Sequence, residues 1–150
     1  GHNLVICGHN GAGKSSIFRC LGGLWPVSTG RVTCPHGAGD PRGAGLHGAA
    51  YYLPQRPANI LGTLSDQLTY PARVPGGMPE EELRRWLSYV EAEHLVDAAV
   101  QAGELRAEAD WATKLSLGEQ QRLGIARVLY HRPCFAILDE CTPAVSKDME

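Results

Sequence analysis

A glycine-rich stretch near the start of the chain constrains its fold more than any other feature of the sequence. Residues 8–15 read GHNGAGKS and match the pattern G-x-x-x-x-G-K-S in full. Residues 3–7 before it, with the apolar run Leu4-Val5-Ile6-Cys7, predict a buried parallel strand, and residues 14–22 predict a helix. A strand, a glycine-rich loop and a helix in this order predict a phosphate-binding loop.

The chemistry of this loop explains its residue types. Gly11 and Gly13 let the backbone turn so that successive N–H groups point at a phosphate, and the N-terminus of the following helix adds positive potential. We expect Lys14 to reach the β- and γ-phosphates and the Ser15 hydroxyl to bind Mg²⁺. The candidate phosphate-binding residues are consecutive: Gly8, His9, Asn10, Gly11, Ala12, Gly13, Lys14, Ser15 and Ser16.

The composition narrows the class of protein. The chain has 150 residues, of which 43% are hydrophobic and 20% charged, and this fits one folded domain with a core. A net charge of −2 gives no support for nucleic acid as a partner, and no apolar run approaches the roughly 18 residues of a membrane span. The five cysteines form no C-x-x-C pair, so we expect reduced thiols in a cytosolic setting, several of them buried.

A second candidate ligand residue follows a second predicted core strand, residues 49–53. This strand ends at Pro54-Gln55-Arg56-Pro57, where two prolines favour an extended loop. Open α/β sheets place their ligand residues at the carboxyl ends of the strands, so Gln55 is a candidate ligand residue. Between the two strands, residues 31–34 could form a further short strand, and residues 35–48 read as a surface loop.

The middle of the chain predicts helices. A short helix is expected to begin near Thr63, and residues 93–101 predict another. Residues 79–91 predict a longer helix with three glutamates in its first turn, where they favour the helix dipole. Its apolar face consists of Leu83, Trp86, Leu87 and Val90.

Residues 115–120, LSLGEQ, begin a further helix. Ser116 is a favourable N-cap, and Glu119 three residues later completes a capping box. The helix is expected to run to about residue 130 and to be largely buried, because apolar residues cover most of its circumference.

The apolar residues 134–138 predict a third buried strand, which ends in two acidic residues. Asp139 is expected to hold Mg²⁺ opposite Ser15. Glu140 would then lie near the γ-phosphate, where it could polarise an attacking water. An apolar strand that ends in two acidic residues is weak evidence for a nucleotide site on its own. The phosphate loop upstream makes this evidence much stronger.

The phosphate loop, the Gln55 loop, residues 115–120 and the acidic strand together resemble one family. Residues 115–120 are a close variant of the L-S-G-G-Q signature of ABC-type ATPases, and the order of the four motifs resembles an ABC ATPase domain over essentially the whole chain. The resemblance implies an α/β fold of the P-loop NTPase type. A parallel sheet would be formed by residues 1–61 and 117–150, with an inserted helical subdomain at about 62–116. ATP and Mg²⁺ are the implied cofactors.

Several shorter runs are similar to subfamily D, the peroxisomal very-long-chain fatty-acyl half-transporters. They are residues 21–26 (LGGLWP), 53–57 (LPQRP), 61–64 (LGTL) with Asp66-Gln67 and Tyr70-Pro71, and 138–142 (LDECT) with 144–146 (AVS). Cys141, directly after the two acids, is similar to the peroxisomal members in particular. Bacterial fused permease–ATPases share the proline–glutamine and signature runs, and they stay as the alternative within the subfamily.

The resemblance also implies roles for individual residues. Two such domains would pair head to tail and enclose two ATP molecules, and a transmembrane domain would be the other partner. The implied catalytic residues are Glu140, Gln55 and Lys14. The implied metal ligands are Ser15, Gln55 and Asp139. The residues implied to contact the ATP of the opposite subunit are Ser116, Gly118 and Glu119.

The sequence also departs from the family pattern. Leu117 stands in place of the first glycine of the signature pair, Glu119 in place of its glutamine, and Pro143 where serine is usual. The aromatic residue that stacks on adenine and the switch histidine would lie before Gly1 and beyond Glu150 respectively. We therefore expect an ABC domain that is incomplete at both ends, with little activity of its own.

The resemblance implies an ATPase motor domain that faces the cytosol at the peroxisomal membrane and moves fatty acids or fatty acyl-CoA. Two other classes stay open. One is a soluble ABC ATPase, against which the Gln55 run and the lack of basic patches argue. The other is a truncated fragment that binds nucleotide without turnover.

Overall fold

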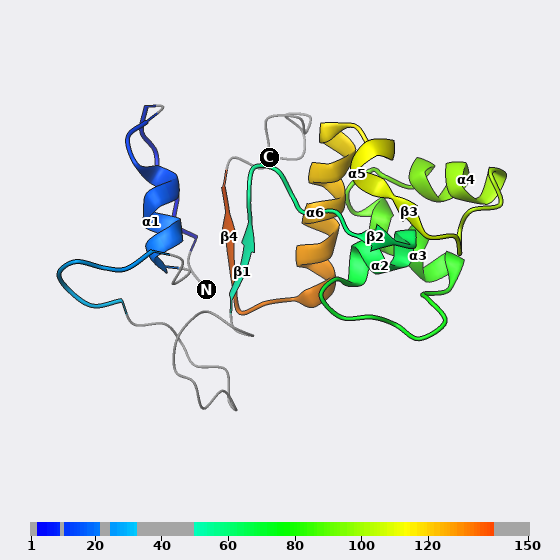
Figure 1. The fold of residues 1–150 in the computed structure, drawn as a ribbon, viewed down its shortest axis with the longest axis horizontal. Helices are drawn as coiled ribbons and strands as arrows, with labels where there is room; N and C mark the ends of the chain where they lie inside the picture. The colour runs from blue at the N-terminus through cyan, green and yellow to red at the C-terminus, as the bar shows by residue number, and fades with distance from the viewer. Residues whose placement is uncertain (1–2, 10, 22–24, 33–49, 140–150) are drawn as a thin grey trace.

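The computed structural model describes residues 3–9, 11–21, 25–32 and 50–139. Its elements form layers around a small parallel sheet of β1 (Ala50–Leu53) and β4 (Phe135–Leu138). Helix α1 (Lys14–Leu21) covers one face of this sheet, and helix α6 (Leu117–His131) covers the other (Figure 1). This arrangement is the α/β architecture predicted from the sequence.

The register of the sheet brings two of the predicted motifs to one edge. Leu53 is paired with Leu138, so the two parallel strands end side by side. The N–H of Asp139 donates to the carbonyl oxygen of Leu53 at 3.0 Å and extends the ladder by one residue. The Gln55 loop and Asp139 therefore leave the sheet at the same edge, where α/β sheets bind their ligands.

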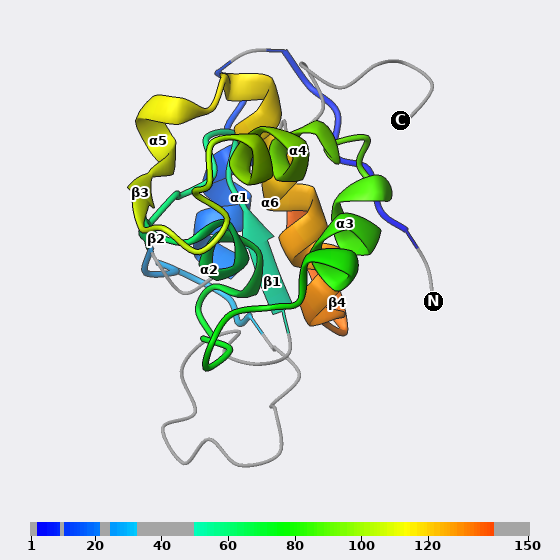
Figure 2. The same cartoon turned by 90° about the vertical axis from the view of Figure 1, so that its right-hand side faces the viewer.

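The remaining elements form a helical cluster on the far side of α6 (Figures 1 and 2). Helices α2 (Leu64–Thr69) and α3 (Glu80–Ser88) pack against α6, and α3 packs against α4 (His94–Gln101). A short antiparallel pair, β2 (Leu61–Gly62) and β3 (Ala109–Asp110), leads into α5 (Trp111–Lys114). The helix predicted near Thr63 is confirmed, because Thr63 caps α2 with a capping box.

One hydrophobic core joins this cluster to α6. The predicted apolar face of α3 is buried in it, which confirms the helical periodicity. The core residues in the cluster are Leu64, Leu68, Met78, Leu83, Trp86, Leu87, Val90, Ala92, Leu95, Val96, Ala99, Trp111 and Leu115, and Leu123 and Ala126 join them from α6.

The predicted strand at residues 3–7 is wrong. The segment has no regular secondary structure, and Leu4 and Val5 are 85% and 78% exposed. A strand exists only through hydrogen bonds to a neighbour, and in the described part of the chain the parallel sheet contains only β1 and β4. Residues 31–32 are likewise not a strand, and residues 33–49, with the predicted loop, lie outside the described residues.

The third predicted strand forms as β4, but its predicted burial is wrong. Phe135 and Leu138 are 55% and 49% exposed, because β4 has a strand on one side only within the described residues. The expected burial of cysteines is not found in the described residues, where Cys7 and Cys134 are exposed and Cys20 is half-buried; Cys34 and Cys141 lie outside them.

Gly124 in α6 permits a close approach between this helix and the end of β1. A Cβ atom at position 124 would lie 2.7 Å from Cδ1 of Leu53 and 2.9 Å from Cγ of Pro57. The Pro57 ring is rigid and cannot turn away. We expect Gly124→Ala to lower the free energy of unfolding by about 1–3 kcal/mol, because overpacking outweighs the better helix propensity of alanine. Chemical denaturation measures this, and an unchanged or higher stability would contradict the packing described here.

Candidate functional site

The phosphate loop has the backbone conformation that its glycines predict. Gly11 and Gly13 adopt φ angles of +83° and +90°, which L side chains rarely adopt. The N–H of Ala12 donates to the carbonyl oxygen of His9 at 3.1 Å, and α1 begins directly after Gly13. The loop therefore ends at a helix N-terminus, where backbone N–H groups and the dipole favour an anion.

The Lys14 side chain folds back over this loop. Its ammonium donates to the carbonyl oxygens of Gly8 at 2.8 Å and of His9 at 3.2 Å. The positive charge is thus held at the loop backbone. A phosphate in the loop would offer the ammonium stronger, charge-assisted acceptors than these neutral carbonyls.

Asp139 connects the phosphate loop to the sheet. The Ser15 hydroxyl donates to Oδ1 of Asp139 at 3.1 Å, although 124 residues separate the two in the sequence. Asp139 is only 8% exposed. The predicted juxtaposition of these two oxygen-bearing side chains at the carboxyl edge of the sheet is therefore present.

Tyr52 on β1 is a third member of this group, and the sequence analysis missed it. Its hydroxyl donates to Oδ2 of Asp139 at 2.9 Å, so both oxygens of the carboxylate have a partner. Burial raises the pKa of Tyr52 above its ordinary value of 10.0, and the bond to Asp139 raises it further. The signal in the sequence is its position, one residue before the end of a strand that finishes beside Asp139.

The Gln55 loop is fixed to α6 through its backbone. The Gln121 side-chain amide donates to the carbonyl oxygen of Gln55 at 3.1 Å, and the Arg127 guanidinium donates to that of Ala58 at 2.9 Å. Both side chains are almost fully buried, at 1% and 3% exposure. The sequence analysis missed them, because a polar residue inside an apolar helix pattern reads as solvent-facing.

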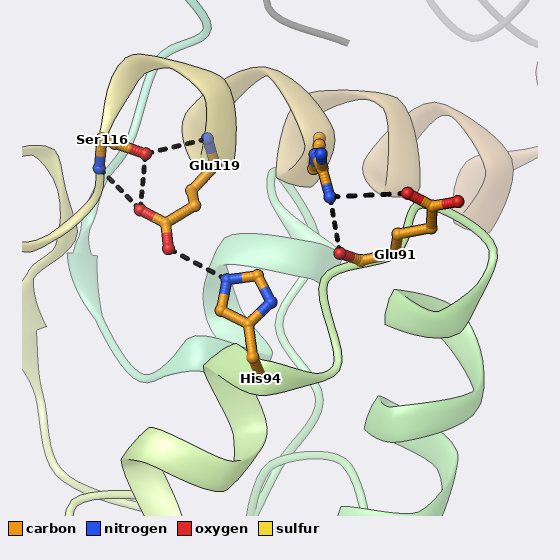
Figure 3. Close-up of polar contacts among 5 residues, drawn as sticks. Glu91, His94, Ser116 and Glu119 are labelled. Carbon is orange, nitrogen blue, oxygen red and sulfur yellow. Dashed lines mark hydrogen bonds and ion pairs between the residues drawn. The ribbon is translucent and has the colours of Figure 1, made fainter. Parts of the chain in front are cut away.

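Residues 116–119 form the predicted capping box at the start of α6 (Figure 3). Oε2 of Glu119 accepts from the Ser116 N–H at 2.8 Å and from the Ser116 hydroxyl at 2.6 Å, and Oε1 lies 3.0 Å from Nε2 of His94. Partial burial raises the pKa of Glu119, but the hydrogen bonds from Ser116 and His94 outweigh it. The net pKa lies below the ordinary 4.5, so Glu119 is an anion at neutral pH.

A protein-family model described as "ABC transporter" matches residues 1–143 of this chain. The chain belongs to the ABC transporter family. It is 48% identical over 155 residues to "ABC transporter D family member 1" of Arabidopsis thaliana, which covers all of this chain and 11% of that protein. It is 44% identical over 154 residues to "ATP-binding cassette sub-family D member 3" of Mus musculus, with all of this chain and 21% of that protein covered.

A further relative is "ATP-binding cassette sub-family D member 1" of Drosophila melanogaster, which is 43% identical over 154 residues, all of this chain and 20% of that protein. The chain thus spans about a tenth to a fifth of the length of these relatives. The family match confirms the ABC transporter family and the P-loop fold class that the motifs indicated, and each of these relatives is named as a D family or sub-family D member.

The geometry of this ABC transporter domain brings together some of the predicted site residues and separates others. Ser15 and Asp139 meet, whereas α1 with its phosphate loop and α6 with Ser116 lie on opposite faces of the sheet (Figure 1). Asn10 and Glu140 lie outside the described residues. Within the described residues, histidine, cysteine and acidic side chains form no group of three or more that could hold a metal, and no helix there could cross a membrane.

Proposed function

We propose that this chain is the ATP-binding and ATP-hydrolysing motor domain of a subfamily D ABC transporter. The observation that carries the proposal is the bond between Ser15 and Asp139, which joins the phosphate loop to the acidic end of β4. This contact places a hydroxyl and a carboxylate beside a loop that is shaped for phosphates. The family match supports an ATPase as the reaction class.

Mg²⁺ fits the oxygen atoms that the structure offers. Ser15 and Asp139 supply a hydroxyl and a carboxylate, both hard donors of the kind that Mg²⁺ prefers, already 3.1 Å apart. We propose these two residues, with Gln55, as the residues that hold the ion. When held by these residues, Mg²⁺ would offset the negative charge that develops on the γ-phosphate.

The remaining roles belong to side chains of this chain and of a second copy. Lys14 binds the β- and γ-phosphates, and Glu140, which directly follows Asp139, takes the proton of the attacking water. We assign Ser116 and Gly118, at the start of α6, to the site of the opposite subunit; α6 and α1 lie on opposite faces of the sheet (Figure 1). Glu119 supports them as part of the capping box.

The transported substrate is proposed from the subfamily resemblance. We assign this domain to a transporter of fatty acids or fatty acyl-CoA in the peroxisomal membrane, with the motor domain in the cytosol. It would act with a second ABC domain and a transmembrane domain. The elements α2 to α5 and β3 fall within the inserted helical subdomain that we propose for residues 62–116, and β2 crosses its first boundary.

The test is ATP turnover by the full-length protein in lipid nanodiscs. We expect hydrolysis that requires Mg²⁺ and that very-long-chain acyl-CoA stimulates about 2–5-fold, in the range where a ligand shifts a conformational equilibrium modestly. Short-chain acyl-CoA serves as the control ligand. Hydrolysis that persists in excess chelator would contradict the metal assignment, and a lack of any acyl-CoA effect would contradict the substrate class.

A further inference from the structure

The start of α6 has a side-chain contact that its capping box does not need. A capping box requires only Ser116 and Glu119, which satisfy each other's orphan backbone groups. Here the second carboxylate oxygen of Glu119 also lies 3.0 Å from Nε2 of His94, the first residue of α4 (Figure 3). A carboxylate only accepts hydrogen bonds, so Nε2 of His94 is the donor.

A second polar contact joins the same two parts of the molecule one helical turn further along α6. The Arg122 guanidinium donates to the carbonyl oxygen of Glu91 at 2.7 Å and lies 3.9 Å from Oε2 of the same residue. Positions 119 and 122 share one face of the helix. Residues 91–94, at the junction of α3 and α4, therefore contact the first turns of α6 at two points.

The electrostatic setting explains why the contact to His94 matters at Glu119 in particular. The signature pattern has a neutral glutamine at this position, whereas this chain has an anion close to where a phosphate of the opposite subunit would approach. The side chain of Glu119 is 28% exposed, and without His94 only the capping-box bonds from Ser116 to Oε2 would hold its carboxylate. The hydrogen bond from His94 keeps the carboxylate on the side of α4. There it still accepts from Ser116, and it repels the phosphate less.

We propose that His94 is a positioning residue for the trans half of the ATP site: it holds Glu119 so that Ser116 and the N-terminus of α6 are preorganised for the γ-phosphate bound by the partner subunit. The inference rests on the proposed function. His94 touches neither ATP nor metal in this scheme, and it acts through Glu119. Loss of His94 should therefore raise KM for ATP and change kcat much less.

The experiment compares three variants in the full-length transporter. His94→Ala removes the donor, and His94→Gln keeps an N–H donor at a similar reach without the ring. Asp97→Ala is the matched control, because it breaks the 2.7 Å ion pair between α4 and Arg84 without touching α6. The readouts are KM and kcat for Mg·ATP, fluorescent ATP binding to the phosphate loop under conditions that keep the subunits apart, and the thermal unfolding midpoint.

We expect His94→Ala to raise KM about 3–10-fold, with kcat and phosphate-loop affinity within about twofold of wild type, since a partly exposed charge-assisted bond is lost. His94→Gln should restore KM, and Asp97→Ala should leave it unchanged. A merely structural role would lower the unfolding midpoint of both Ala variants without a KM effect specific to His94.

Two results would overturn the inference: an unchanged KM in His94→Ala, or a KM in His94→Gln as high as in His94→Ala. A wild-type protein without any ATP turnover would instead refute the proposed function itself. The two failures are thus separated by the wild-type measurement alone.

Discussion

ATP binding is expected to be lost when Lys14 is replaced by alanine. The Lys14 ammonium is held over the phosphate loop, where it donates to the carbonyl oxygens of Gly8 and His9. In the presence of ATP these bonds would be exchanged for charge-assisted bonds to the β- and γ-phosphates. Removal of the Lys14 ammonium should weaken ATP affinity by about 100-fold or more. Two hydrogen bonds to the phosphates are lost, and the negative charge of the phosphates is left uncompensated.

A fluorescent ATP analogue titrated into the purified protein measures this affinity. Lys114→Ala is the matched control, because it is the same substitution at an exposed lysine that pairs with Glu104 in the helical cluster. It should bind ATP like the wild type. An unchanged affinity in Lys14→Ala would refute the assignment of residues 8–15 as the phosphate loop. Circular dichroism would show that both variants are folded.

The features that were predictable from the sequence are those fixed by a few neighbouring residues. Two glycines at fixed spacing demanded positive φ angles, and the structure has them at Gly11 and Gly13. A serine followed by a glutamate three residues later gave the capping box of α6. Such signals depend on the local backbone geometry of a few residues, and distant parts of the chain change that geometry little.

The predictions that were wrong, and the contacts that were missed, depend on residues that are distant in the sequence. Residues 3–7 are apolar enough for a strand, yet strand formation needs a neighbour to accept its hydrogen bonds. The hydrogen bond from Tyr52 to Asp139 could not be predicted from the sequence either, because it follows from the register of β1 against β4. Gln121 was missed because its buried amide serves the backbone of a loop 66 residues away.

The same distinction applies to function. The motifs identified the family, and the family comparisons confirmed it. The contact from His94 to Glu119, by contrast, joins two helices and corresponds to no motif. Residues that contact a ligand belong to recognisable motifs. Residues that only position a site do not, and the sequence around them indicates no more than their local secondary structure.

Asp139→Asn is expected to abolish Mg²⁺-dependent hydrolysis while the fold survives. Asparagine keeps the shape of the side chain and one acceptor oxygen, and the hydroxyls of Ser15 and Tyr52 can accept as well as donate, so the buried group can stay satisfied. The lost negative charge is what Mg²⁺ requires. ATP turnover should fall by about 10³-fold or more, because the metal supplies several kcal/mol of charge stabilisation in phosphoryl transfer.

Two further variants separate the charge of Asp139 from its neighbours. Tyr52→Phe removes one hydrogen bond to Asp139 and leaves the charge, so turnover should stay within about fivefold of wild type, the worth of one hydrogen bond. Glu140→Gln should bind Mg·ATP like the wild type and yet not hydrolyse it, since only the proton acceptor is lost. Mn²⁺ binding in the presence of ATP, followed by electron paramagnetic resonance, should fail in Asp139→Asn alone. If Asp139→Asn binds the metal normally, Asp139 is a structural anchor for Ser15 and Tyr52, and the ion must be held elsewhere at this edge of the sheet.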